Sequence, residues 1–212
     1  YDFGPCADAA TLVLCRDARD IAISAYGALF TVTTAANVVP NLFYFFNFQN
    51  VTIAGASFTD AGFDPRPDWR GMVCVGLQAD RPSRGFTLVD CYAERVVSLL
   101  SSHNNAATRR FLSNIRVHGE VRQAYYGVGA SFISENVDVD LVCHNVRRGI
   151  IASALRNADI RMTVSSTAHW PGSNGLIALI CGGASVGNVE NVRVTLAAFG
   201  QCIHDSYVHF YH

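Results

Sequence analysis

Asn136-Val137-Asp138-Val139-Asp140-Leu141 is the stretch of sequence that decides the fold. It starts with a turn residue and then alternates apolar and polar side chains, as a short β-strand with one buried face does. Six other stretches repeat this pattern, and their first apolar residues are Ile21, Val51, Phe86, Ile115, Ile160 and Val192. The spacing varies, from 22 residues between Ile115 and Val137 to 35 between Val51 and Phe86. Such a repeat predicts a solenoid, in which the core pattern is kept while the loops differ in length.

The composition of the chain fits a single all-β domain over residues 1–212. With 212 residues and 50% hydrophobic side chains, the chain is long enough to bury one core. Helical periodicity is poor, and apolar residues instead alternate or form short runs flanked by Gly, Asn and Asp. The shortest repeats cannot hold two strands and a crossover helix. We therefore expect a parallel β-solenoid of about seven rungs. Because Tyr1 is not an initiating Met, we also expect the chain to be part of a longer one.

Charge and hydropathy disfavour two classes of partner. The formal net charge is −1, which gives no sequence-independent attraction to nucleic acid or to an anionic membrane. No run approaches the roughly 18 apolar residues of a membrane-spanning segment, so we expect no membrane insertion. The seven Cys residues include no C-x-x-C pair, and most lie in apolar runs, which predicts buried thiols rather than a disulfide framework.

One segment and four turns carry a resemblance to a known fold family. The segment is Phe46-Asn47-Phe48-Gln49-Asn50-Val51-Thr52-Ile53-Ala54-Gly55, and the turns, in which Asn precedes Val or Ile, begin at Asn50, Asn114, Asn136 and Asn191. Over residues 21–208 the chain resembles the pectin-lyase-like superfamily of right-handed parallel β-helices. Within it, the chain is most similar to the β-helices of bacteriophage tailspikes and polysaccharide depolymerases.

That resemblance implies a right-handed parallel β-helix that acts in a homotrimer, located in a phage virion or secreted. It also implies a bacterial surface polysaccharide as the partner, cleaved by hydrolysis or β-elimination. The Asn-Thr-Asp and Asp-Asp motifs of polygalacturonases do not occur here, which speaks against their particular hydrolase chemistry. The alternative function is that of a non-catalytic β-helix that binds surface glycan or spaces other domains.

Aligning the repeats on the turn residue predicts which side chains face outward. Residues one and three positions after the turn are apolar and point inward, so residues two and four positions after it point outward. The outward pairs that carry charge in neighbouring repeats are Arg116/His118, Asp138/Asp140 and Arg161/Thr163. With strands about 4.8 Å apart, this alignment places Asp138 between Arg116 and Arg161, and Asp140 between His118 and Thr163.

This outward cluster is the candidate catalytic site. Asp138 and Asp140 would serve as the acid and base of a glycosidase. His118 would instead remove the proton next to a sugar carboxylate, or position the substrate, while Arg116 and Arg161 stabilise charge. The alternative is a surface ladder of alternating charge, which cross-strand neighbours form without any function.

Three aromatic residues are candidates for sugar binding. Trp69 and Trp170 each follow the first strand of a repeat, so they should project from the same edge, where a flat aromatic ring stacks well on a sugar. The alternative is that each Trp covers the side of the solenoid. Tyr125 is the third candidate, although either Tyr125 or Tyr126 must face inward.

The sequence predicts no cofactor and no metal. Asp60, Asp64 and Asp68 fall in one loop and are possible Ca²⁺ ligands, but they lack the residue order and the closing Glu of an EF-hand. The turn-forming tendency of Asp accounts for them more simply.

Overall fold

A computed structural model describes residues 2–6, 11–34, 41–63, 71–76, 83–103, 112–129, 133–152, 154–166, 176–181, 189–200 and 206–211. Every regular element in these ranges is a β-strand. The strands are β1 (Asp2–Cys6), β2 (Thr11–Arg16), β3 (Arg19–Ser24), β4 (Leu29–Thr34), β5 (Asn41–Phe46), β6 (Gln49–Ala54), β7 (Ser57–Asp60), β8 (Val73–Gly76), β9 (Arg84–Glu94), β10 (Ser98–His103), β11 (Leu112–Arg122), β12 (Tyr126–Gly129), β13 (Ile133–His144), β14 (Arg148–Ala152), β15 (Ala154–Ser166), β16 (Leu176–Cys181), β17 (Glu190–Gly200) and β18 (Ser206–Tyr211). The described elements include no helix that could cross a membrane.

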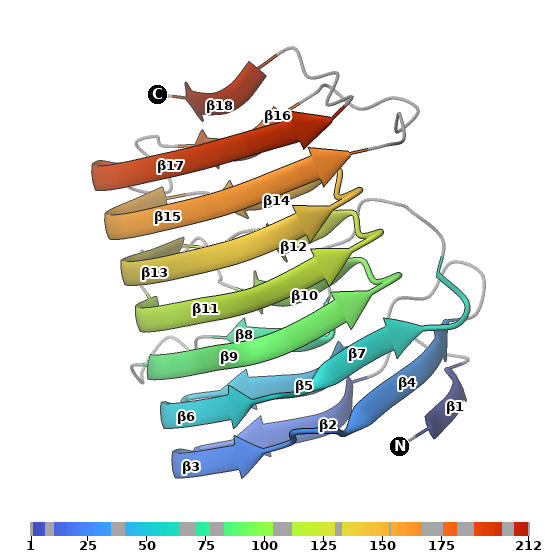
Figure 1. The fold of residues 1–212 in the computed structure, drawn as a ribbon. Helices are drawn as coiled ribbons and strands as arrows, with labels where there is room; N and C mark the ends of the chain where they lie inside the picture. The colour runs from blue at the N-terminus through green and yellow to red at the C-terminus, as the bar shows by residue number, and fades with distance from the viewer. Residues whose placement is uncertain are drawn as a thin grey trace.

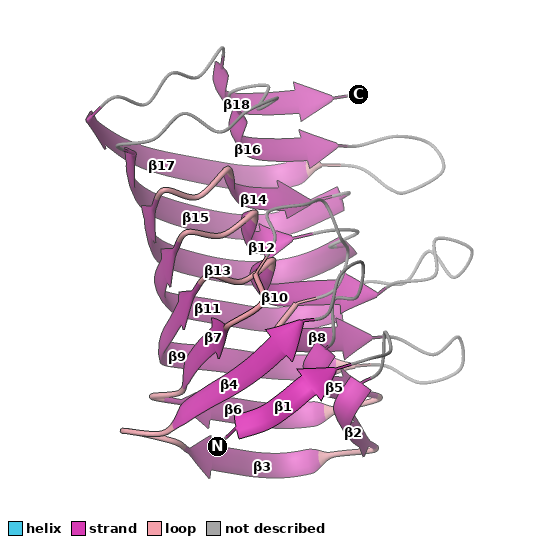
Figure 2. Cartoon of the chain, turned by 90° about the vertical axis from the view of Figure 1, so that its right-hand side faces the viewer, coloured by secondary structure: helices cyan, strands magenta, loops and turns pink. Residues whose placement is uncertain are grey.

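The strands form two parallel sheets that face each other (Figure 1). The larger sheet has ten strands and runs from β1 and β3 to β17, and the smaller has eight and runs from β2 to β18. From β7 onward, successive strands alternate between the two sheets, and each pairs in parallel with the strand before and after it in its own sheet. Figure 2 shows the same stack from the side, with β1 near one end and β18 at the other. The prediction of an all-β chain with parallel pairing is confirmed.

The core lies between the two sheets and is built by the predicted inward positions. Side chains of the larger sheet that are at most 3% exposed include Val51, Ile53, Phe86, Leu88, Ile115, Val117, Val137 and Val139. They meet buried side chains of the smaller sheet, among them Leu42, Phe45, Val73, Val75, Leu99, Val128 and Ile150. The Phe86 ring lies 5.3 Å from the ring centroids of both Phe45 and Phe48. Cys74, Cys91 and Cys143 are buried free thiols, as the sequence predicted.

The repeating Asn residues form a ladder at the start of the larger sheet's strands. Asn114, Asn136, Asn157 and Asn191 all have φ between 50° and 57°, a left-handed conformation that Asn tolerates better than most residues. The side-chain amide of each of the last three donates to the amide oxygen of the preceding Asn, at 3.2, 3.3 and 3.1 Å. Each Asn therefore fixes its own turn and also links neighbouring repeats.

One repeat begins two residues earlier than the sequence alignment placed it. The turn residue of this repeat is Asn157, which lies within β15 and has a φ of 50°, whereas Asp159 is not among the residues with a positive φ. Ala158 is the first inward residue and is 4% exposed, so a small side chain takes the place that Val or Ile takes elsewhere. With the turn at Asn157, the first two outward residues of this repeat are Asp159 and Arg161, rather than Arg161 and Thr163.

Candidate functional site

The predicted charged cluster does form, on the outward face of three neighbouring strands. Arg116 and His118 of β11 lie beside Asp138 and Asp140 of β13, as the sequence predicted. On the other side, however, Asp138 lies beside Asp159, and Asp140 lies beside Arg161. The predicted placement of Asp138 opposite Arg161, and of Asp140 opposite Thr163, is wrong because the β15 repeat starts at Asn157.

Asp138 is nevertheless the centre of the cluster. One carboxylate oxygen, Oδ2, is 2.9 Å from Nε2 of His118 and 3.2 Å from Nε of Arg116. The other, Oδ1, accepts a hydrogen bond from Nη2 of Arg161 at 2.7 Å. The Arg161 side chain crosses to Asp138 because a guanidinium is long and carries several donors in a fork.

Arg161 joins three carboxylates. Besides Asp138, its Nε donates to Asp140 at 3.1 Å and its Nη1 donates to Asp159 at 2.8 Å. Hydrogen bonding to Asp140 is the main reason why the pKa of Arg161 is raised, with the charges of all three carboxylates adding to the effect. The guanidinium is therefore held in one place and stays charged.

The surroundings of Asp138 keep its carboxylate ionised. Partial burial is the largest single influence and acts to raise the pKa, but it is outweighed by the hydrogen bond from His118 and the charges of His118, Arg161 and Arg116. The net result is a pKa below the ordinary value of an Asp. A general acid must carry a proton at working pH, so this site argues against Asp138 in that role.

The contact with Asp138 also determines how His118 can act. An ionised carboxylate can only accept, so Nε2 of His118 must carry the hydrogen of this contact. In the neutral ring, Nδ1 then holds a lone pair that can accept a proton. A His oriented by a carboxylate is the arrangement that general bases commonly use. The His118 side chain is 31% exposed, which leaves it open to a substrate.

A shallow pocket of about 300 Å³ adjoins the cluster on the side of the Asn ladder. It is lined by Arg116 and Asp138, together with Thr87 of β9 and the ladder residues Asn114 and Asn136. A bound molecule in this pocket would contact the Arg116 guanidinium, whose side chain is 58% exposed.

Tyr125, the other predicted site residue within the described part of the chain, does not join the cluster. Tyr125 is only 4% exposed, packs edge-on against Tyr126 at 4.6 Å, and carries the Arg147 guanidinium 4.5 Å from its ring centroid, so its ring offers no open face. Trp69 and Trp170 lie outside the described residues. Asp60 is buried and accepts backbone hydrogen bonds from Thr34 and Gly62, as a turn-forming Asp does. Asp64 and Asp68 also lie outside the described residues.

Sequence reasoning missed several outward residues. Asp159 was missed because it was taken as a turn. Glu120 and Arg122 of β11, and His144 of β13, follow from simple alternation carried to the ends of these long strands. Simple alternation does not predict that Tyr92 and Glu94 of β9 face outward, because an irregularity at Asp90 changes which residues of β9 face outward. No signal in the sequence marks this irregularity.

Asp138→Asn should destabilise the protein by on the order of 1 kcal/mol at neutral pH, because the network loses its central charge. A lowered pKa in the folded state stabilises the protein above the unfolded pKa, and this contribution is lost as pH falls through the folded value. The melting-temperature difference between wild type and variant should thus be full at neutral pH and shrink below about pH 3.8. A difference that stays constant down to the acid limit would contradict the proposed network.

The chain matches no known protein-family model, and neither a curated protein nor a solved structure matches it.

Proposed function

We propose that the chain is a right-handed parallel β-helix that binds an acidic polysaccharide on the outward face of β11, β13 and β15 and cleaves it by β-elimination. Two facing parallel sheets, with strands alternating between them, support the β-helix. Right-handedness follows from the general rule that connections between parallel strands of one sheet are right-handed in about 98% of cases. The resemblance to the pectin-lyase-like superfamily and its tailspike depolymerases favours a bacterial surface polysaccharide as substrate.

The observation that carries the proposed chemistry is the 2.9 Å contact between His118 Nε2 and Asp138 Oδ2. Nδ1 of His118 takes the proton from the sugar carbon next to the carboxylate. The electron pair left behind forms a carbon–carbon double bond, the bond to the glycosidic oxygen breaks, and that oxygen takes a proton from solvent. Asp138 stabilises the imidazolium that forms. No water is added to the sugar.

Arg116 has the second role in this mechanism. Removing a proton beside a carboxylate places extra negative charge on that carboxylate, and a fixed cation lowers the energy of the charged intermediate. Arg116 contacts Asp138 through Nε at 3.2 Å, and its side chain is 58% exposed. Its terminal nitrogens can therefore bind a sugar carboxylate in a forked pair. Arg161, in contrast, already donates to three carboxylates.

Hydrolysis by two carboxylates is less well supported. It requires one protonated carboxyl group as acid, and the lowered pKa of Asp138 removes one of the two predicted candidates. The other, Asp140, accepts from the charged Arg161 guanidinium and is 51% exposed in its side chain.

A non-catalytic glycan-binding or spacer role is the second candidate function, and one observation favours it. Each carboxylate of the cluster has a cationic partner within the protein, since Arg161 pairs with Asp138, Asp140 and Asp159. Such cross-strand pairs arise on exposed sheets without catalysis, and each contributes only about 0–1 kcal/mol.

Incubation with a panel of uronate-containing polysaccharides distinguishes these functions. We expect ultraviolet absorbance of an unsaturated product with at least one member of the panel, made from polygalacturonate, alginate, hyaluronan and bacterial capsular polysaccharides. New reducing ends without this absorbance would indicate hydrolysis instead. Binding without any cleavage would favour the adhesive function.

A further inference from the structure

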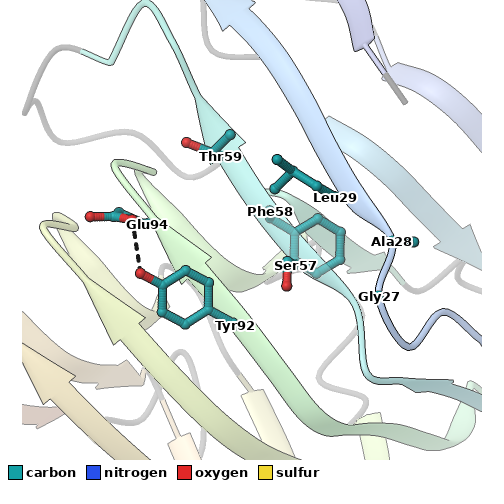
Figure 3. A pocket seen from close by; sticks show the side chains of 8 residues that line it. All are labelled: Gly27, Ala28, Leu29, Ser57, Phe58, Thr59, Tyr92 and Glu94. Atoms are coloured by element: carbon teal, nitrogen blue, oxygen red, sulfur yellow. Dashed lines mark hydrogen bonds between the residues drawn. The ribbon is translucent and has the colours of Figure 1, made fainter.

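A second hollow lies on the same outward face, among the strands nearer the N-terminus (Figure 3). It has a volume of about 510 Å³, within the range of roughly 300–1,000 Å³ that small-molecule sites occupy. Strands β4, β7 and β9 and the turn before β4 form it. The lining side chains that matter here are Leu29, Ser57, Thr59, Tyr92 and Glu94. We call it the Tyr92 pocket.

Polar and apolar groups occupy opposite sides of the Tyr92 pocket. The Tyr92 hydroxyl donates to Oε2 of Glu94 at 2.8 Å, which fixes the carboxylate and leaves its second oxygen for a ligand hydroxyl. Burial, followed by the hydrogen bond to Glu94, raises the pKa of Tyr92 to about 12, so the phenol stays a donor. Across the hollow, Leu29 is 50% exposed (Figure 3).

This lining suits a neutral sugar ring. A sugar presents C–H groups on its faces, which pack on aromatic and aliphatic side chains, and hydroxyls on its rim, which bond carboxylates and hydroxyls. Among the described lining residues no side chain is cationic, and Glu94 carries a negative charge. The Arg122 guanidinium lies 5.9 Å from the Tyr92 ring centroid but is not part of this lining, so a neutral sugar fits the Tyr92 pocket better than a sugar carboxylate does.

A smaller polar hollow of about 280 Å³ adjoins the Tyr92 pocket and shares Glu94 with it. Arg122 of β11, His144 of β13 and Ser165 of β15 line it. We call it the Arg122 pocket. Hydrogen bonding to Glu120 is the main cause of a raised pKa for Arg122, so its guanidinium stays charged. Ser165 contacts Nδ1 of His144, which orients that ring. Glu94 also lines this pocket and Glu120 pairs with Arg122 at 2.5 Å, but unlike the Tyr92 pocket this one has a guanidinium in its lining, which can bind an acidic ligand.

We propose that the two pockets are adjacent subsites of one glycan-binding groove that runs across the strands. The Tyr92 pocket takes a neutral sugar and the Arg122 pocket takes an acidic one. The preferred ligand is then a polysaccharide in which neutral and acidic sugars alternate. This proposal deepens the proposed function, on which it rests for the acidic character of the substrate.

The position of the groove relative to His118 agrees with this assignment. Glu120 and Arg122 follow His118 on the same strand and face the same way, at two and four residues' distance. At about 3.3 Å per residue, Arg122 is roughly 13 Å from His118 along β11. An acidic sugar bound at Arg122 and the proton-accepting His118 therefore lie on one continuous surface.

Binding of defined oligosaccharides to the full chain tests the proposal. The probes are hyaluronan oligosaccharides, which alternate uronate and neutral amino sugar, alginate and polygalacturonate oligosaccharides, which are acidic throughout, and glucose and mannose oligosaccharides, which are neutral. We expect the alternating probe to bind at least tenfold more tightly than either uniform class. Equal affinity for the uniform acidic probes, or no binding of any probe, would overturn the proposal.

Four variants locate that binding. Tyr92→Ala and Glu94→Gln should each weaken hyaluronan binding about tenfold. Arg122→Gln should remove the preference for hyaluronan over the neutral probes, and Tyr92→Phe should keep part of the affinity because the ring remains. Thermal melting identifies any variant that fails to fold. If Tyr92→Ala does not fold, the binding affinity of Glu94→Gln, which conserves the shape of the side chain, tests the proposal instead. Unchanged binding in folded Glu94→Gln and Arg122→Gln would place the ligand elsewhere.

The same measurements separate this proposal from the proposed cleavage. Thr52→Ala, on the outward face of β6 and in the lining of neither pocket, should leave hyaluronan binding within about twofold. Binding that depends on Tyr92 in a protein that cleaves nothing would support the groove and refute the cleavage. Cleavage that is unaffected by Tyr92→Ala and Glu94→Gln would support the proposed cleavage and refute the groove.

Discussion

His118→Ala should abolish cleavage of the polysaccharide substrate, with kcat lower by about 10²–10⁴-fold. The variant removes the proton acceptor, while the ring it deletes is partly exposed and makes its polar contact with a surface carboxylate. Folding should therefore be little affected, and the melting temperature should stay close to that of the wild type. The measurement is the initial rate of unsaturated product formation at saturating substrate, with melting recorded beside it.

Two further variants control for indirect effects. Asp138→Asn should lower kcat by less than His118→Ala, because His118 keeps its proton-accepting nitrogen but loses its orientation and the stabilisation of its charged form. Thr52→Ala, at the outward position of β6 that corresponds to Arg116 and Asp138, should leave kcat unchanged. A rate that His118→Ala does not reduce would exclude His118 as the base.

Phe86→Ala should lower the free energy of unfolding by about 3–5 kcal/mol. The Phe86 side chain is fully buried between the sheets, in contact with the rings of Phe45 and Phe48 at 5.3 Å each. Its removal takes apolar area out of the core and leaves a cavity that two rigid sheets cannot close. Urea unfolding followed by circular dichroism measures the change.

Thr87→Ala is the matched control for Phe86→Ala. Thr87 is the next residue on β9 and faces outward, so its replacement should change stability by less than about 0.5 kcal/mol. Equal losses of stability in the two variants would mean that Phe86 does not face inward and Thr87 does not face outward. The assignment of the outward face of the larger sheet would then be wrong.

The sequence predicted the larger sheet well because its pattern is periodic and local. A turn-forming Asn followed by alternating apolar residues determines which side of each strand is buried, and parallel stacking then brings Arg116, His118, Asp138 and Asp140 together. The prediction failed at β15, where two candidate turn residues lie two positions apart. Asn157 and Asp159 give the same inward and outward alternation, so only the register itself distinguishes them.

The groove around Tyr92 was beyond sequence reasoning for a different reason. In β9, Phe86 and Leu88 face inward, but so do Cys91 and Ala93, because Asp90 adopts a φ of 53° and adds one residue to the strand. Alternation counted from Gly85 would place Tyr92 and Glu94 inside the core. The ionisation of Asp138 was equally inaccessible, since it depends on distances to three basic side chains from two other strands.

The masses of the cleavage products test the central claim most directly. Elimination splits the chain without adding water, so the masses of the two products should sum to that of the substrate oligosaccharide, with an unsaturated sugar at one new end. Hydrolysis adds one water. Products whose masses sum to the substrate, lost in His118→Ala, would establish proton abstraction on the outward face. Products heavier by one water would contradict His118 as the base of an elimination.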